Sequence, residues 1–384
     1  MNPLDLFHYD TLRLIWWVLL GVLLIGFALT DGFDLGSLIL LPFVAHKDGE
    51  RRIVINAIGP VWEGNQVWLI LGAGAIFAAW PLVYATAFSG FYPAMILALA
   101  GLVIRPVAII YRSKVEARSW RTIFDGLMVI ASFVPALIFG VAIGNVIQGA
   151  PFRFDASSMR LIYEGIFFDL LNPFALVTGL LSVCMITMHG GAYLAIKTEE
   201  TIAFRARIAG FISALLVIAL FVAAGVWVAL SIKGYLLLSA VSVDGDSDPL
   251  AKLVSRSTGA WFANYGASHW LMAAPLMGLF AAASAAIGFA TGRDRMALIA
   301  SGISVFGVIA TVGVSMFPFI LPSSLDPRSS LTVWDASSSK ATLLTMLAAT
   351  VIFLPLILIY TTFIYRVLRG RVSGRDVEAD HGSY

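Results

Sequence analysis

Residues 12–44 read LRLIWWVLLGVLLIGFALTDGFDLGSLILLPFV, and this stretch decides the fold class. A helix that spans a bilayer needs about 20 mostly apolar residues. At 1.5 Å per residue this run would form a helix about 50 Å long, which is more than one crossing requires. The polar segment TDGFDLG at residues 30–36 therefore indicates a tilt, a locally unwound stretch or an extension into the cytosol.

Eight further apolar runs follow the first. They lie near residues 53–79, 83–111, 122–148, 168–196, 206–232, 266–291, 296–321 and 341–367. Hydrophobic residues make up 59% of the chain and charged residues 12%, whereas soluble domains carry about 25% charged residues. The sequence predicts an all-α polytopic membrane protein with about nine transmembrane helices in the lipid bilayer. The net charge of +2, without a basic patch, excludes a nucleic-acid partner.

The distribution of lysine and arginine predicts the orientation of the chain in the membrane. Alternate connections and the C-terminal tail hold 16 of the 25 basic residues, and cytoplasmic loops are the ones enriched in such residues. The longer loops, at residues 148–167, 233–268 and 322–340, fall on the opposite side. We therefore expect the N-terminus outside and the C-terminus in the cytoplasm.

Four ionisable side chains lie far from the predicted helix ends: Asp31, Asp34, Glu63 and Arg105. Counted along the helices, all four lie about 10 to 20 Å from the cytoplasmic ends. Such residues are costly in hydrocarbon and usually mark a functional path or a paired site. Two interpretations remain open at this point, a cytoplasmic proton path and a buried structural ion pair.

The surroundings of Glu63 are unusually polar for a membrane helix. Residues 59–68 read GPVWEGNQVW, in which Pro60 frees a backbone carbonyl while Asn65 and Gln66 add polar groups. Arg105 would keep Glu63 charged if it reached it, whereas pairing of Arg105 with an aspartate would leave Glu63 able to load and release protons. Two tryptophans inside this run are candidates for lining a site: Trp62 and Trp68.

Histidine and cysteine usage predicts no metal or heme ligand in this chain. His189 is the only histidine well inside a predicted helix, and a lone histidine is more often a hydrogen-bonded core residue than a ligand. Cys184 is the single cysteine, so the sequence contains no CxxCH heme-attachment motif. We expect no redox centre bound directly by this chain.

These fragments together resemble subunit II of the cytochrome bd ubiquinol oxidases, including the cyanide-insensitive bd-type oxidases, over essentially the whole chain. The fragments that carry the resemblance are residues 13–17 (RLIWW), 26–34 (GFALTDGFD), 62–69 (WEGNQVWL), 78–81 (AAWP), 88–92 (FSGFY), 105–106 (RP), 171–174 (LNPF), 316–319 (MFPF) and 331–336 (LTVWDA). Two positions depart from some family members, which have aspartate in place of Glu63 and histidine in place of Val61.

The resemblance implies a heme-free subunit of a quinol:oxygen oxidoreductase in the bacterial inner (cytoplasmic) membrane. Subunit I of the family holds two b-type hemes and heme d, and the complex oxidises quinol and reduces oxygen to water without pumping protons. The resemblance also implies a possible structural quinone and a possible small single-helix accessory subunit. It predicts two four-helix bundles, at residues 1–148 and 168–321, a final helix at 341–367 and a cytoplasmic tail at 368–384.

Two alternatives to a proton-conducting subunit remain at the level of sequence. Broken helices with charges near the midplane also mark ion-coupled secondary transporters, although the polar residues here cluster in the first three runs and lack a counterpart in the later half. A purely structural or assembly subunit is the second alternative. It predicts that Glu63→Ala lowers complex abundance and activity together.

Overall fold

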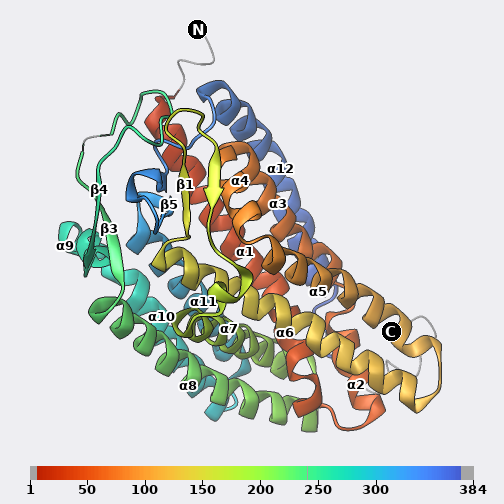
Figure 1. Cartoon of the computed structure of the whole chain (residues 1–384). Helices are drawn as coiled ribbons and strands as arrows, with labels where there is room; N and C mark the ends of the chain where they lie inside the picture. The colour runs from red at the N-terminus through yellow and green to blue at the C-terminus, as the bar shows by residue number, and fades with distance from the viewer. Residues whose placement is uncertain (1–6, 240, 373–384) are drawn as a thin grey trace.

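The computed structural model describes residues 7–239 and 241–372, so residues 373–384 of the expected cytoplasmic tail lie outside it. The described chain is predominantly helical (Figure 1). The longer helices are α1 (Tyr9–Val44), α3 (Trp62–Ala79), α5 (Tyr92–Tyr111), α6 (Arg118–Gln148), α7 (Pro173–Lys197), α8 (Glu200–Leu230), α10 (Ala273–Ala290), α11 (Asp294–Met316) and α12 (Lys340–Val367). The shorter ones are α2 (Asp48–Ile58), α4 (Pro81–Gly90) and α9 (Ala263–Ala267).

Helix α1 is continuous over its 36 residues. The unwound stretch considered for residues 30–36 is therefore wrong, because the backbone of this segment stays helical. Asp31 and Asp34 lie inside the helix and are fully buried. Because the two are three residues apart, they share one face of α1.

The second predicted run is divided into two helices. Helix α2 ends at Ile58, residues 59–61 form a turn that contains Pro60, and α3 begins at Trp62. Within the described residues, eight helices are long and apolar enough to span a membrane, and each overlaps one of the eight predicted runs other than 53–79. Helix α3 is not among them, and its first turns carry Glu63, Asn65 and Gln66. The chain is thus a multi-pass membrane protein, while the orientation of its termini stays a prediction.

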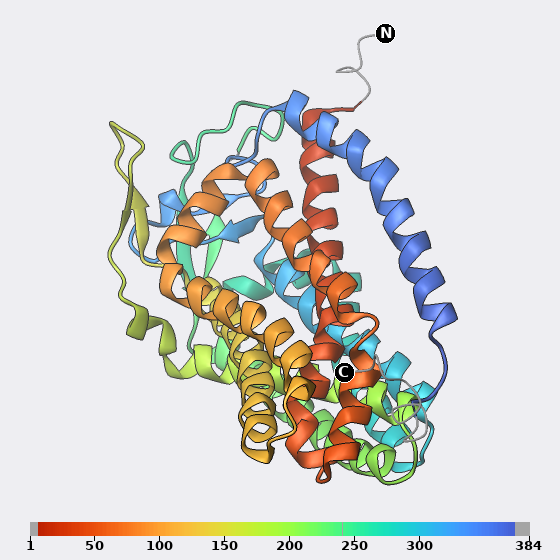
Figure 2. The same ribbon diagram turned by 90° about the vertical axis from the view of Figure 1, so that its right-hand side faces the viewer.

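Helix α1 lies at the centre of the molecule and packs against α3, α6 and α7 (Figure 1). Helices α7, α8, α10 and α11 pack closely on one another, as do α5 and α6. Helix α12 crosses the outside of the structure and makes few contacts with α1 and α3 (Figure 2). Since α1 touches both groups of helices, the division into bundles at 1–148 and 168–321 stays a prediction.

The expectation of an entirely α-helical chain needs one correction, because the three long loops contain small antiparallel sheets. The first pairs β1 (Phe152–Phe154) with β2 (Leu161–Tyr163), the second β3 (Lys233–Leu237) with β4 (Val254–Thr258), and the third β5 (Phe319–Leu321) with β6 (Leu331–Thr332). These strands have only two to five residues. The alternation of apolar and polar residues that indicates a strand is too short in them to be recognised from the sequence. They cover one end of the helical bundle (Figure 1).

Candidate buried charge cluster

The centre of the cluster is an ion pair between α1 and α5. The Arg105 Nη2 atom lies 2.6 Å from Asp31 Oδ1, and both side chains are fully buried. The other oxygen of Asp31, Oδ2, and the Nε and Nη1 atoms of Arg105 are buried without a hydrogen-bond partner in the described part of the chain. Arg105 therefore pairs with an aspartate and not with Glu63.

A second line of polar contacts runs from Asp34 toward the end of α12. Asn65 of α3 donates a hydrogen bond of 2.7 Å to Asp34 Oδ2, and the Tyr365 hydroxyl donates one of 2.8 Å to Asn65 Oδ1. Asn65 is 2% exposed, whereas Tyr365 is only half-buried. The hydrogen-bonded chain Tyr365–Asn65–Asp34 thus leads from the surface near the C-terminal end of α12 into the interior, one helical turn from Asp31.

The other candidate residues from the sequence form no hydrogen bond or ion pair with the described residues of this cluster. Glu63 is exposed on the first turn of α3 and forms no hydrogen bond or ion pair with any described residue. Gln66 donates a long hydrogen bond of 3.5 Å to the Leu102 carbonyl of α5. Trp62 and Trp68 are both buried. The structure therefore brings together four of the candidates: Asp31, Asp34, Asn65 and Arg105. Glu63 precedes Asn65 by two residues, but its side chain is exposed on the surface of the protein.

His189 is a hydrogen-bonded core residue. Its Nδ1 lies 2.8 Å from the Ser301 hydroxyl and its Nε2 lies 3.1 Å from the Leu29 carbonyl oxygen, so both ring nitrogens are engaged within the protein. Within residues 7–239 and 241–372, no three histidine, cysteine, aspartate or glutamate side chains are grouped so that they could hold a metal ion.

A second charge network, which the sequence did not predict, joins α2 and α6 to the short turn after α5. Arg112 contacts Asp125 at 2.5 Å and Asp48 at 2.8 Å, while Arg121 contacts Asp48 at 2.7 Å. Burial acts to raise the pKa of Asp48, but hydrogen bonding and attraction from Arg112, with Arg121 beside it, bring that pKa below its ordinary value. Arg112 and Arg121 therefore have a structural role, because their ion pairs connect the start of α2 with the turn after α5 and the first turns of α6.

Tyr365 is the cluster residue that sequence reasoning missed. It lies 300 residues from Asn65 in the chain, near the end of an apolar helix where a tyrosine ordinarily indicates a membrane interface. No local pattern marks its hydroxyl as a partner of a buried amide. Only the crossing of α12 over α3 brings the two together.

Tyr365→Phe is expected to loosen α12 without unfolding the protein. The substitution removes one hydrogen bond to a buried amide oxygen, which costs about 1 kcal/mol. Because α12 has few other contacts with the bundle, hydrogen–deuterium exchange at α12 should increase several-fold, whereas exchange in α7 should stay at the wild-type rate. Equal exchange at α12 in both proteins would show that the Tyr365 hydroxyl does not hold this helix. Tyr360→Phe is the matched control, since Tyr360 lies on the same helix with its side chain exposed.

Comparison with known proteins agrees with this architecture. The sequence profile described as "Cytochrome bd terminal oxidase subunit II" matches residues 12–368. The chain is 46% identical to cytochrome bd-I ubiquinol oxidase subunit 2 of Escherichia coli K12 over 377 residues, covering 98% of this chain and 99% of that protein. It is 30% identical to cytochrome bd ubiquinol oxidase subunit 2 of Bacillus subtilis over 365 residues, covering 94% and 97% of the two chains.

A solved structure shares the fold. A chain of the bd oxidase from Geobacillus thermodenitrificans superposes with a TM-score of 0.64, at 15% sequence identity, over 93% of this chain and 98% of that one. The profile match and the identity to full-length relatives show more than the fold, because they extend over nearly the whole sequence. The chain belongs to the family of cytochrome bd terminal oxidase subunit II.

Proposed function

We propose that this chain is the heme-free subunit II of a quinol:oxygen oxidoreductase in the bacterial inner membrane, and that its buried charge cluster forms part of a cytoplasmic proton path. Its partner is subunit I, which in this proposal holds two b-type hemes and heme d. The engagement of both His189 ring nitrogens by Ser301 and Leu29 supports this assignment of the hemes to the partner. The alternative of an ion-coupled secondary transporter is not pursued, because the chain belongs to an oxidase subunit family.

The observation that carries the proton path is the charge balance of the cluster. Asp31 and Asp34 together face one guanidinium, that of Arg105. If both carboxyl groups were ionised, the buried cluster would hold a net charge of −1, and an uncompensated charge in the interior is costly. One proton on Asp34 makes the cluster neutral, so the site is suited to holding an exchangeable proton.

The polar groups around the cluster supply a route for that proton. Tyr365 and Asn65 connect Asp34 to the surface by hydrogen bonds. The unpaired buried atoms of Asp31, Asp34 and Arg105 are donors and acceptors of the kind that ordered water binds. Glu63, exposed on the same helix as Asn65, is suited to exchange protons between this route and a neighbouring subunit.

Glu63→Gln and Asp34→Asn test the proposal in the complex purified through a tag on this chain. Each variant is expected to retain heme b and heme d absorption bands per mole of protein, while quinol-dependent oxygen uptake slows by about tenfold or more, because a proton-carrying group is lost. Glu116→Gln, an exposed loop carboxylate, is the control and should match the wild type. A structural role predicts instead that heme content and oxygen uptake fall in proportion.

A further inference from the structure

A cavity of about 550 Å³ opens at the long-loop end of the bundle, where α7 begins and α8 ends. Its lining includes Phe174, Trp227, Lys233, Arg256 and Ser324. Phe174 of α7 and Trp227 of α8 contact each other edge to face, with ring centroids 5.9 Å apart, and form its apolar wall. None of the lining residues is acidic.

The register of the β3–β4 hairpin places both cations of this cavity on one face. Tyr235 pairs directly with Arg256, and Lys233 pairs with Thr258. Side chains two residues apart on a strand, and side chains directly opposite on the neighbouring strand, project from the same face of a sheet. Lys233 and Arg256 are therefore diagonal neighbours, and their positive charges add in the same space.

Neither cation is neutralised by a carboxylate in the described part of the chain. Arg256 donates only to two carbonyl oxygens, those of Ser324 at 3.2 Å and Gln148 at 3.4 Å, and lies over the Tyr235 ring at 5.0 Å. Its Nε atom is buried without a hydrogen-bond partner. Lys233 is exposed and forms no hydrogen bond or ion pair with a described residue. The two positive charges are thus not balanced by any acidic side chain of the described residues.

Apolar side chains continue from the cavity along the adjoining helices. Val226, Trp227 and Leu230 in the last turns of α8 are 52%, 38% and 73% exposed, and Leu176 in the first turn of α7 is 37% exposed. In a membrane-spanning bundle, such a surface at a helix end contacts acyl chains just below the head groups, and tryptophan is enriched at that level. The site thus joins an anion-binding region to a surface for hydrocarbon.

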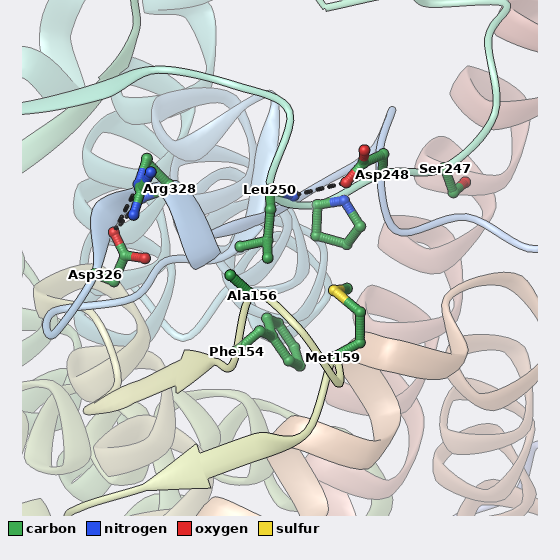
Figure 3. Close-up of a pocket in the computed structure, with 9 residues that line it drawn as sticks. Phe154, Ala156, Met159, Ser247, Asp248, Leu250, Asp326 and Arg328 are labelled. Carbon is green, nitrogen blue, oxygen red and sulfur yellow. Dashed lines mark hydrogen bonds and ion pairs between the residues drawn. The ribbon is translucent and has the colours of Figure 1, made fainter.

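A second cavity, among the long loops, differs from the Lys233–Arg256 cavity in the charges that line it. It has a volume of about 630 Å³ and is lined by Asp248, Asp326 and Arg328 together with Phe154, Met159 and Leu250 (Figure 3). Its single arginine is already paired with Asp326 at 3.5 Å. That cavity therefore presents no free positive charge to an anion.

We propose that the Lys233–Arg256 cavity binds the phosphate of an anionic phospholipid, with the acyl chains lying on α7 and α8. The glycerol-linked phosphate contacts the guanidinium and the ammonium group. The ligand is a lipid and not a free phosphate, because the cations line the same cavity as the apolar side chains of Phe174 and Trp227.

The test is native mass spectrometry of the delipidated complex titrated with phosphatidylglycerol. Lys233→Gln is expected to weaken phosphatidylglycerol binding about fivefold and the double variant Lys233→Gln/Arg256→Gln by more than about tenfold, since each basic residue near the head groups contributes to the attraction. Lys233 is exposed and unpaired, so the single variant does not disturb folding. Arg328→Gln, in the other cavity, is the control and should bind phosphatidylglycerol like the wild type.

Three results would overturn the proposal. Phosphatidylcholine of the same chain lengths binding as tightly as phosphatidylglycerol would show that the cations do not select the ligand. Displacement of the lipid by an equal concentration of inorganic phosphate would make the cavity a site for the free anion. Retention of a quinone but no phospholipid by the wild-type complex, with no loss in either variant, would assign the cavity to another ligand.

Discussion

Arg105→Met will strongly reduce the amount of assembled complex, because it leaves Asp31 without its partner in a fully buried position. The wild-type pair is 2.6 Å apart and both side chains are 0% exposed. Removing one member of such a pair costs about 3–5 kcal/mol, since the remaining charge stays desolvated or must take up a proton. The measurement is heme d content per membrane protein, together with the midpoint of thermal inactivation in detergent.

The double variant Asp31→Leu/Arg105→Met separates stability from proton transfer. Replacing both members of a buried ion pair by apolar residues is often neutral or stabilising, so complex abundance should recover toward the wild-type level. Oxygen uptake should remain low if the pair also belongs to the proton path. Recovery of both abundance and oxygen uptake would contradict a proton role for this pair and leave it as a structural contact. Wild-type stability of Arg105→Met itself would show that Asp31 does not depend on Arg105.

The sequence predicted the charged centre of the cluster because isolated charges in apolar runs are visible without any knowledge of folding. Asp31, Asp34 and Arg105 were identified in this way and do lie together. Glu63 was grouped with them because its position was counted along one continuous helix over residues 53–79. The turn at residues 59–61 starts a new helix, and the side chain at Glu63 is exposed, two residues from the buried Asn65.

Contacts between distant parts of the chain could not be predicted from local patterns. Tyr365 reaches Asn65 only because α12 crosses α3. Arg112 meets Asp48, which lies 64 residues away in the chain, only because α2 lies against the turn between α5 and α6. The hairpins in the loops could not be predicted for a different reason. Strands of two to five residues are too short to show the alternation of apolar and polar residues that indicates a strand. The lengths of the apolar runs thus predicted most of the long helices. Which polar side chains pair with one another could be seen only in the tertiary structure.

Gly36→Ala is expected to destabilise the protein by about 3 kcal/mol, because a methyl group at this position has no space. A Cβ on Gly36 would collide with the Ile186 carbonyl of α7 and would lie 3.2 Å from the Gly190 Cα atom. The opposite substitution meets the same obstacle, since a Cβ on Gly190 would lie 2.5 Å from the Ser37 nitrogen of α1. The obstacles are backbone atoms, which cannot rotate away, so α1 and α7 must move apart.

This movement would also disturb the charge cluster, because Asp34 lies two residues before Gly36 on α1. Gly36→Ala should therefore lower both the midpoint of thermal inactivation and the quinol-dependent oxygen uptake of the complex that still assembles. Gly21→Ala is the matched control on the same helix, since a Cβ there meets no atom within 4 Å. Alanine is the better helix former by about 1 kcal/mol, so the control should be as stable as the wild type or slightly more stable. Equal behaviour of the two variants would mean that α1 and α7 tolerate separation, and the close crossing would not be what holds Asp31 and Asp34 in place.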